Sequence, residues 1–341
     1  MRTSWVNNGL VFGIIALFIF SSITPSVAVD TVKKPSMPIS DKTVITVDDD
    51  GDGDYTSIKE ALNHSNQGDT IEVYSGTYYE YDINIEIEDI TLKGMPYELG
   101  NGSDIGKPFI NGEGKDDLIN IKAKNGVIDG FKIENDGGSL ANTIITLFEE
   151  SNGCTISNND IAHTTMSCIW SSSSNNKILN NYISHSIIRN GVVLCDPCSN
   201  CLVSGNVISD VEIGIDLWDS NHNTITGNKI SRCREFGIDI AGSDYNTIKG
   251  NSFEDNAVGV HIIYDSRGSR IKNNNFINNQ LQAYCVYGFP FFYDLTNRWN
   301  GNYWNESHSL PYPIRGARIF FLFVQFDWHP AQEPYDIEVV I

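Results

Sequence analysis

The sequence predicts an all-β fold, a right-handed parallel β-helix of about nine coils, on three observations. A cassette of 23 or 22 residues recurs through the middle of the chain, and such a fixed period is typical of stacked repeats. Short runs inside each cassette, such as Gly-Ile-Asp-Leu, alternate apolar and polar residues as strands do. An asparagine also recurs at one position of the cassette. The cassettes begin at Gly191, Gly214, Gly237 and Gly259.

Winding these cassettes into coils predicts which residues stack on one another. Sustained helical spacing is missing from the repeats and their apolar residues are mainly Ile and Val, so helical and leucine-rich solenoids are disfavoured. One interior column is Ile169, Val192, Ile215, Ile238 and Val260, and another is Ile156, Ile178, Val203, Ile225, Ile248 and Ile271. The recurring asparagines fall at a turn, where each amide can bond to its equivalent one coil away; they are Asn159, Asn181, Asn206, Asn228, Asn251 and Asn274.

The first 28 residues predict a secretory signal peptide. Arg2 precedes an apolar run over residues 10–20, and small residues at 26–28 suit cleavage. This run is short for a membrane span, although an uncleaved anchor is the alternative. Residues 29–42, with two prolines, are expected to form a linker. The mature chain is therefore predicted to be secreted or held at the cell surface, with no membrane span.

Both ends of the repeat array are expected to carry caps. Residues 43–84 form the N-terminal cap, in which Ser57 and Glu60 make a capping box for a short helix. Such a helix can cover the open end of the solenoid and its unpaired strand edge. The repeats occupy residues 85–294, and the aromatic-rich residues 295–341 form the C-terminal cap.

Charge limits the classes of partner. The net charge is −20 and the isoelectric point is near 4.6, which disfavours nucleic acid and anionic membranes. The same charge disfavours strongly acidic polymers unless calcium bridges the like charges.

Two segments are candidate metal sites. Cys195, Cys198 and Cys201 form a C-x-x-C-x-x-C pattern that could hold a soft metal, whereas a disulfide in this turn, or one to Cys168, is the expected alternative. With seven cysteines, at least one thiol is left without a partner in the chain. Near the start of the mature chain, Asp48, Asp50 and Asp52 match the first half of an EF-hand loop. Lys59 stands where the loop needs glutamate, so a plain Asp/Gly turn is the alternative to weak Ca²⁺ binding.

An exterior column supplies the candidate catalytic residues. The third position of each Gly-Ile-x-Ile strand points outward, which stacks Asp216, Asp239 and His261 in adjacent coils below Trp170 and Val193. Two neighbouring carboxylates raise the pKa of one of them, as an acid/base pair requires. The same three residues could instead bind a divalent cation. Candidates for stacking on sugar rings or binding their hydroxyls are Trp170 in this column and, nearby, Trp218, Asp219, Tyr264 and Arg267.

The chain resembles the NosD-type, or CASH-domain, family of parallel β-helix proteins with PbH1 repeats. Three stretches carry the resemblance: GDGDYTSIKEAL…GDTIEVYSGTYYE, the repeats GIxI…NTIxGNxI, and the closing NRWNGNYWNE…PYPI…FDWHP…EPYDI. The closing stretch is similar to the tails of archaeal exported surface members. The resemblance implies the β-helix, and its functional implication is broad because the family mixes copper-delivery factors, polysaccharide enzymes and surface proteins.

Four functions follow as expectations. The first is an exported β-helix that binds carbohydrate polymers or glycans on the exterior column. The second is a polysaccharide lyase or glycoside hydrolase that uses the paired aspartates. The third is a structural or adhesive envelope protein, and the fourth is NosD-like copper handling, which the scarcity of Met-rich and His-rich tracts disfavours.

Overall fold

A computed structural model describes residues 43–115, 117–136, 142–186, 189–263, 266–287, 297–318 and 321–339. The chain divides into two units, residues 1–39 and 40–341, and the first lies outside the described residues. The expected signal peptide and linker also fall there. Within the described residues, no helix has the length and apolar character that crossing a lipid bilayer requires.

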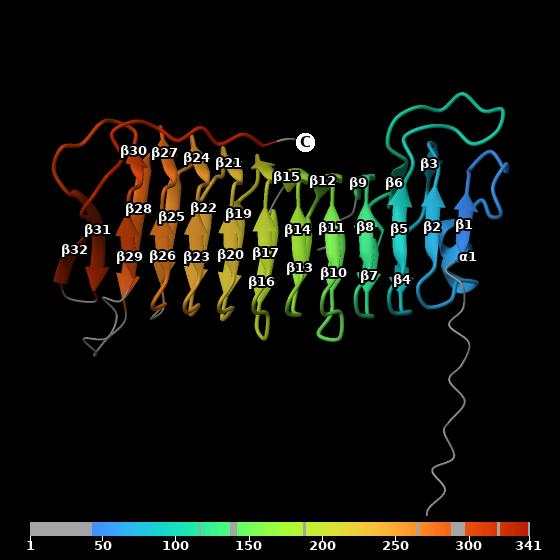
Figure 1. Cartoon of the computed structure of the whole chain (residues 1–341), viewed down its shortest axis with the longest axis horizontal. Helices are drawn as coiled ribbons and strands as arrows, with labels where there is room; N and C mark the ends of the chain where they lie inside the picture. Colours follow the sequence, from blue (N-terminus) through green and yellow to red (C-terminus); the bar gives the residue numbers. More distant parts are fainter. Residues whose placement is uncertain are drawn as a thin grey trace, which may run out of the picture. The chain divides into compact units, whose positions relative to one another are not determined.

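The second unit is a right-handed parallel β-helix of about ten turns whose coils follow one another in chain order (Figure 1). Its strands form three parallel faces. Face 1 contains β4 (Ile83–Ile85), β7 (Ile119–Ile121), β10 (Ile145–Leu147), β13 (Ile169–Ser171), β16 (Val192–Cys195), β19 (Ile213–Trp218), β22 (Phe236–Ala241), β25 (Val258–Ile263), β28 (Leu281–Tyr287) and β31 (Tyr312–Arg318).

Face 2 contains β1 (Val44–Val47), β2 (Thr70–Val73), β5 (Thr91–Gly94), β8 (Val127–Asp129), β11 (Thr155–Ser157), β14 (Lys177–Leu179), β17 (Leu202–Ser204), β20 (Thr224–Thr226), β23 (Thr247–Lys249), β26 (Arg270–Lys272), β29 (Arg298–Asn300) and β32 (Phe321–Asp327). Face 3 contains β3 (Thr77–Tyr78), β6 (Phe109–Asn111), β9 (Lys132–Glu134), β12 (Asp160–Thr164), β15 (Tyr182–Ser186), β18 (Val207–Ser209), β21 (Lys229–Ser231), β24 (Ser252–Glu254), β27 (Asn275–Ile277) and β30 (Tyr303–Trp304). Stacked strands thus extend into residues 43–84 and 295–341, the two segments that the sequence analysis predicts to be caps.

The two predicted interior columns are confirmed. Residues of the first column pair in register along face 1, and those of the second pair along face 2. All of these side chains are at most 1% exposed, so they fill the bore of the solenoid. The leading glycines are required by close packing. A Cβ on Gly237 would lie 2.5 Å from the carbonyl oxygen of Gly259 and 2.9 Å from the ring of Phe253.

The predicted asparagine ladder is also confirmed. Oδ1 of Asn228 accepts hydrogen bonds from the backbone N–H and the side-chain amide of Asn206, each at 2.9 Å. Asn228 in turn donates to Oδ1 of Asn251 and to the carbonyl of Val203. The ladder continues through Asn302 and ends at Asp327, whose carboxylate accepts from the backbone and the amide of Asn302. Every turn along this edge therefore satisfies its buried polar groups with the next coil.

The short helix α1 (Ile58–Asn63) lies at the N-terminal end, as the sequence predicts. Ser57 is the N-cap residue, and its hydroxyl accepts a hydrogen bond from the backbone N–H of Glu60 at 3.3 Å. The carboxylate of Glu80 accepts from the next two free amides, those of Ile58 and Lys59. The buried side of α1 consists of Ile58, Ala61 and Leu62.

Aromatic side chains fill the bore near the C-terminal end. The rings of Phe253, Phe276, Trp304 and Tyr312 stack in succession with centroids 5.0, 4.4 and 4.3 Å apart. Strands β31 and β32 then form an antiparallel pair, which connects face 1 to face 2. This hairpin covers coils that would otherwise present open strand edges.

Candidate functional site

The exterior column of face 1 has the predicted register. Trp170 pairs with Val193, Val193 with Asp216, and Asp216 with Asp239. Asp239 pairs with His261, and His261 with Tyr284 one coil further on. We call Asp216, Asp239 and His261 the acidic ladder. Its strands β19, β22 and β25 lie side by side in Figure 1.

Asp216 occupies a shielded position on this face. Burial, and then the charge of Asp239 one coil away, raise the pKa of its carboxyl from 3.8 to about 7. A hydrogen bond of 2.8 Å from the amide of Asn190 opposes that shift in the pKa. A carboxyl group with a pKa near 7 can either donate or accept a proton at neutral pH.

Asp239 and His261 form a hydrogen-bonded pair. Nδ1 of His261 lies 2.9 Å from Oδ1 of Asp239, and the two side chains are 10% and 15% exposed. Because a carboxylate oxygen accepts, this contact places a proton on Nδ1 and leaves Nε2 as the basic nitrogen of the neutral ring. The imidazole is held between the rings of Phe236 and Tyr284, with centroids 4.4 and 6.1 Å away. The acidic ladder thus combines a near-neutral acid with an oriented imidazole, the groups that proton transfer requires.

The predicted substrate-binding residues are spread more widely. Trp170 lies in the same column, and Trp218 lies two residues after Asp216 on the same strand with 57% of its surface exposed. Asp219 is exposed just beyond β19, and Arg267 lies on the turn between β25 and β26 rather than on the face itself. Tyr264 lies outside the described residues. Tyr284, Asn190 and Phe236 are neighbours of the ladder that the sequence analysis did not single out. The 23-residue step from His261 to position 284 would have found the first of them.

Two of the three clustered cysteines take positions that polar residues hold in other coils, whereas Cys195 pairs with Trp218. Cys198 occupies the place of Ser220 and Ser243, and Cys201 that of Asn223, whose Oδ1 accepts from the Cys201 backbone. The sulfurs of Cys198 and Cys201 lie 3.3 Å apart in the bore, each at most 2% exposed. Burial raises the pKa of the more accessible Cys195 to about 11. Across the described part of the chain, these three thiols do not converge within 4.8 Å as a shared metal site requires.

The aspartates of the predicted EF-hand-like loop have different partners in the structure. Asp50 meets Glu98 and Asp104, with oxygens of all three within 4.8 Å of one another. Asp52 instead accepts a hydrogen bond from the backbone of Asn101 at 3.0 Å. Sequence reasoning did not identify Glu98 or Asp104, because they lie in another coil about 50 residues further along the chain.

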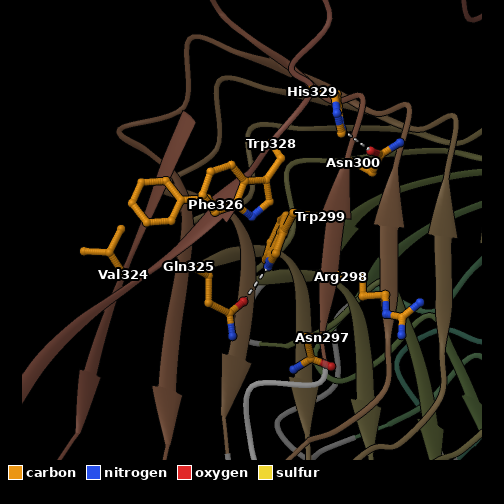
Figure 2. A pocket seen from close by; sticks show the side chains of 9 residues that line it. All are labelled: Asn297, Arg298, Trp299, Asn300, Val324, Gln325, Phe326, Trp328 and His329. Carbon is orange, nitrogen blue, oxygen red and sulfur yellow. Dashed lines mark hydrogen bonds between the residues drawn. The ribbon is translucent and has the colours of Figure 1, made fainter. Parts of the chain in front are cut away.

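A second candidate site is a pocket of about 620 Å³ between β29 and β32 (Figure 2). These two strands pair only at Trp299 and Asp327, so they diverge and leave room between them. Trp299 donates from Nε1 to Gln325 at the floor, and Phe326 and Trp328 lie on one side of the pocket, 39% and 64% exposed. Arg298, Asn300 and His329 supply polar groups. In the sequence, the aromatic-rich residues 295–341 were the one indication of this pocket.

Fold and site together define an all-β solenoid with a polar and aromatic exterior column, the class of right-handed parallel β-helix proteins. A family model described as "Periplasmic copper-binding protein (NosD)" matches residues 100–309, which is more than half of the chain. The chain belongs to the NosD family.

Several solved structures share the fold. They include the PL6 family alginate lyase AlyGC (TM-score 0.53, 12% identity, covering 76% of this chain and 42% of that one). The alginate lyase AlyF-OU02 has a TM-score of 0.51 at 14% identity and covers 82% and 63%. The A-module of the mannuronan C-5 epimerase AlgE6 from Azotobacter vinelandii has a TM-score of 0.50 at 16% identity and covers 82% and 95%. No curated protein matches the chain.

Among the residues that the structure describes, no group of three thiol or imidazole side chains converges as a site for the copper in the family's description. Copper sites use thiolate, thioether or imidazole ligands. In the described ranges the one group of three His, Cys, Asp or Glu side chains with converging ligand atoms is made of carboxylates alone. Burial raises the pKa of Cys154, Cys168 and Cys233, which disfavours the thiolate form that binds metal.

Proposed function

We propose that this protein binds a carbohydrate polymer along face 1, at the acidic ladder and the aromatic residues beside it. The observation that carries the proposal is the register of Trp170, Asp216, Asp239 and His261 on one exterior column, with Trp218 exposed alongside. Aromatic rings supply flat apolar faces, and carboxylates and imidazole supply hydrogen bonds that fix the orientation of a ligand.

Charge narrows the class of glycan. The ladder places two aspartates in adjacent coils of a chain whose net charge is −20. Like charges repel a polyanion, so a neutral glycan is the ligand that these residues favour, with an acidic polymer requiring a bridging cation. The solved relatives by fold include enzymes named for alginate, and this chain differs from them in at least 84% of aligned residues.

Acid/base cleavage of the glycan is the second candidate function. The specific observation in its favour is the pKa of Asp216, near 7, next to the oriented pair of Asp239 and His261. A lyase or hydrolase needs one group to accept a proton and another to donate one at working pH. His261 Nε2 and the Asp216 carboxyl would fill these two roles.

Binding is tested on a panel of neutral and acidic polysaccharides, with calcium and with chelator. Asp216→Asn and Asp239→Asn together should reduce affinity at least tenfold, because each change keeps the size of the side chain but replaces a carboxylate oxygen that accepts from a sugar hydroxyl by an amide nitrogen that donates. Glu254→Gln on face 3 is the matched control and should bind like the wild type. Unchanged binding in the double variant, with loss in Trp328→Ala, would move the site to the C-terminal pocket. Released reducing ends or unsaturated products would establish the second function.

We also propose that the mature protein is exported. The support is the family's periplasmic description and the apolar start of the sequence. Fractionation of the native organism, with mass spectrometry of the mature N-terminus, tests this location and decides between cleavage near residue 28 and a retained anchor.

A further inference from the structure

Acidic side chains from two separate segments converge at the N-terminal end of the solenoid. Asp50 lies in the turn after β1, whereas Glu98 and Asp104 lie in the segment between β5 and β6. One carboxylate oxygen from each lies within 4.8 Å of the others. Oxygens that surround one calcium ion at 2.3–2.6 Å are separated by at most about 5 Å, so the spacing suits a shared ion.

Asp48 provides an independent indication of a ligand. Its side chain is 0% exposed, and its Oδ2 accepts from the backbone N–H of Asp52 at 3.1 Å. Its Oδ1 is buried and has no hydrogen-bond partner among the described residues. The side chain of Asp48 contacts that of Glu98, so its carboxylate is directed toward the cluster. A buried anionic oxygen that faces a second carboxylate requires a positive partner.

Protein cations do not supply that partner. In the described ranges the lysines and arginines that form ion pairs do so with other acids. Asp49 lies in the same acidic turn, where its Oδ2 accepts a hydrogen bond from the backbone N–H of Thr77 at 2.9 Å. Its Oδ1 is likewise buried without a hydrogen-bond partner.

We propose that Asp50, Glu98 and Asp104, with the buried carboxylate of Asp48 beside Glu98, bind a calcium ion that joins the turn after β1 to the segment between β5 and β6. The donors are all oxygen, which selects a hard cation over copper or zinc. Calcium accepts six to eight oxygens in a flexible arrangement, whereas magnesium demands a near-ideal octahedron, so ligands from two loops favour calcium. Glu98 supplies the acid that the linear D-x-D-x-D-G pattern does not provide at its twelfth position.

The site would stabilise the exposed N-terminal end of the solenoid. The two segments are already held together by the hydrogen bond from the Asn101 backbone to Asp52. An ion shared by Asp50, Glu98 and Asp104 would add a link between the first coils, and its binding free energy would add to the free energy of unfolding. This role is independent of any glycan on face 1.

Calorimetric titration of calcium into the chelator-treated full chain tests the proposal, together with terbium luminescence sensitised by nearby tyrosines such as Tyr97. We expect one high-occupancy site and a melting temperature that rises with calcium. Glu98→Gln and Asp104→Asn should each weaken binding at least tenfold, whereas Glu149→Gln on a distant exposed turn should not. Asp104 is itself exposed, so its variant leaves the fold intact.

Two outcomes would overturn the calcium site. One is calcium binding that is absent, or equal in the wild type and both variants. The other is a wild type that ignores calcium but loses stability as pH rises, which would mean that Asp48 and Glu98 share a proton instead of an ion.

Discussion

Replacing Asp216 by asparagine should change the pH dependence of stability. Burial and Asp239 raise the pKa of Asp216 from 3.8 to about 7 in the folded protein. Between these values the folded state keeps a proton that the unfolded state has released, so this group lowers stability as pH rises from about 4 to about 7. The full difference corresponds to about 4 kcal/mol above pH 7, at roughly 1.4 kcal/mol for each pH unit.

Asp216→Asn is neutral at every pH and keeps the shape of the side chain. We therefore expect the variant to match the wild type near pH 4 and to be more stable at pH 8, by up to about 4 kcal/mol. Urea denaturation followed by tryptophan fluorescence at pH 4, 6 and 8 measures this difference, and other titrating groups cancel because both proteins contain them. Asp239→Asn is the companion variant, since removing that charge should lower the pKa of Asp216 and move the transition to lower pH. A difference between Asp216→Asn and wild type that stays constant from pH 4 to 8 would refute the reasoning.

Three further predictions concern packing and accessibility. Asn228→Ala removes the acceptor of two hydrogen bonds from Asn206 and leaves the buried backbone N–H of Asn206 unpaired. It should cost about 3 kcal/mol in urea denaturation, against at most about 0.5 for exposed Lys229→Ala; similar costs would mean that the ladder adds little. Gly237→Ala should lose about 3 kcal/mol, because its Cβ would overlap the next coil. Gly126→Ala, whose nearest atom is 3.4 Å away, should fold normally, and equal stability of the two variants would contradict the packing argument. Thiol reagents should modify Cys195 first in the native protein, and a rapid phase that survives Cys195→Ser would show another thiol to be open.

The repeat period was sufficient to predict the fold and the register of face 1. In a parallel solenoid each residue lies above its equivalent one period earlier, so a step of 23 or 22 residues places Asp216, Asp239 and His261 in one column. A slip of one residue would turn the interior isoleucines toward solvent. Because that exposure is costly, the register is strongly specified. The chemical role of the column stays a prediction.

Features that depend on the non-periodic segments could not be predicted in the same way. Glu98 and Asp104 reach Asp50 because the segment between β5 and β6 turns back toward the first coil. The C-terminal pocket depends on an antiparallel hairpin, whose direction no repeat specifies. The pKa of Asp216 is near neutral mainly because its side chain is buried. The alternation of apolar and polar residues in the sequence predicts only that this side chain points away from the bore, not that its neighbours cover it.

The asparagine ladder has a direction, and its last member gives it an end. Each asparagine passes two donors forward to the following turn, and Asp327 receives them with a carboxylate that has no amide hydrogens of its own to pass on. The forward donors of the last asparagine, Asn302, are therefore all accepted by Asp327. No further coil is needed to bond them. The asparagine of a whole cassette inserted between Asn206 and Asn251 would accept two hydrogen bonds from the turn before it and donate two to the turn after it. The length of this solenoid can therefore vary by complete cassettes while both termini stay chemically unchanged.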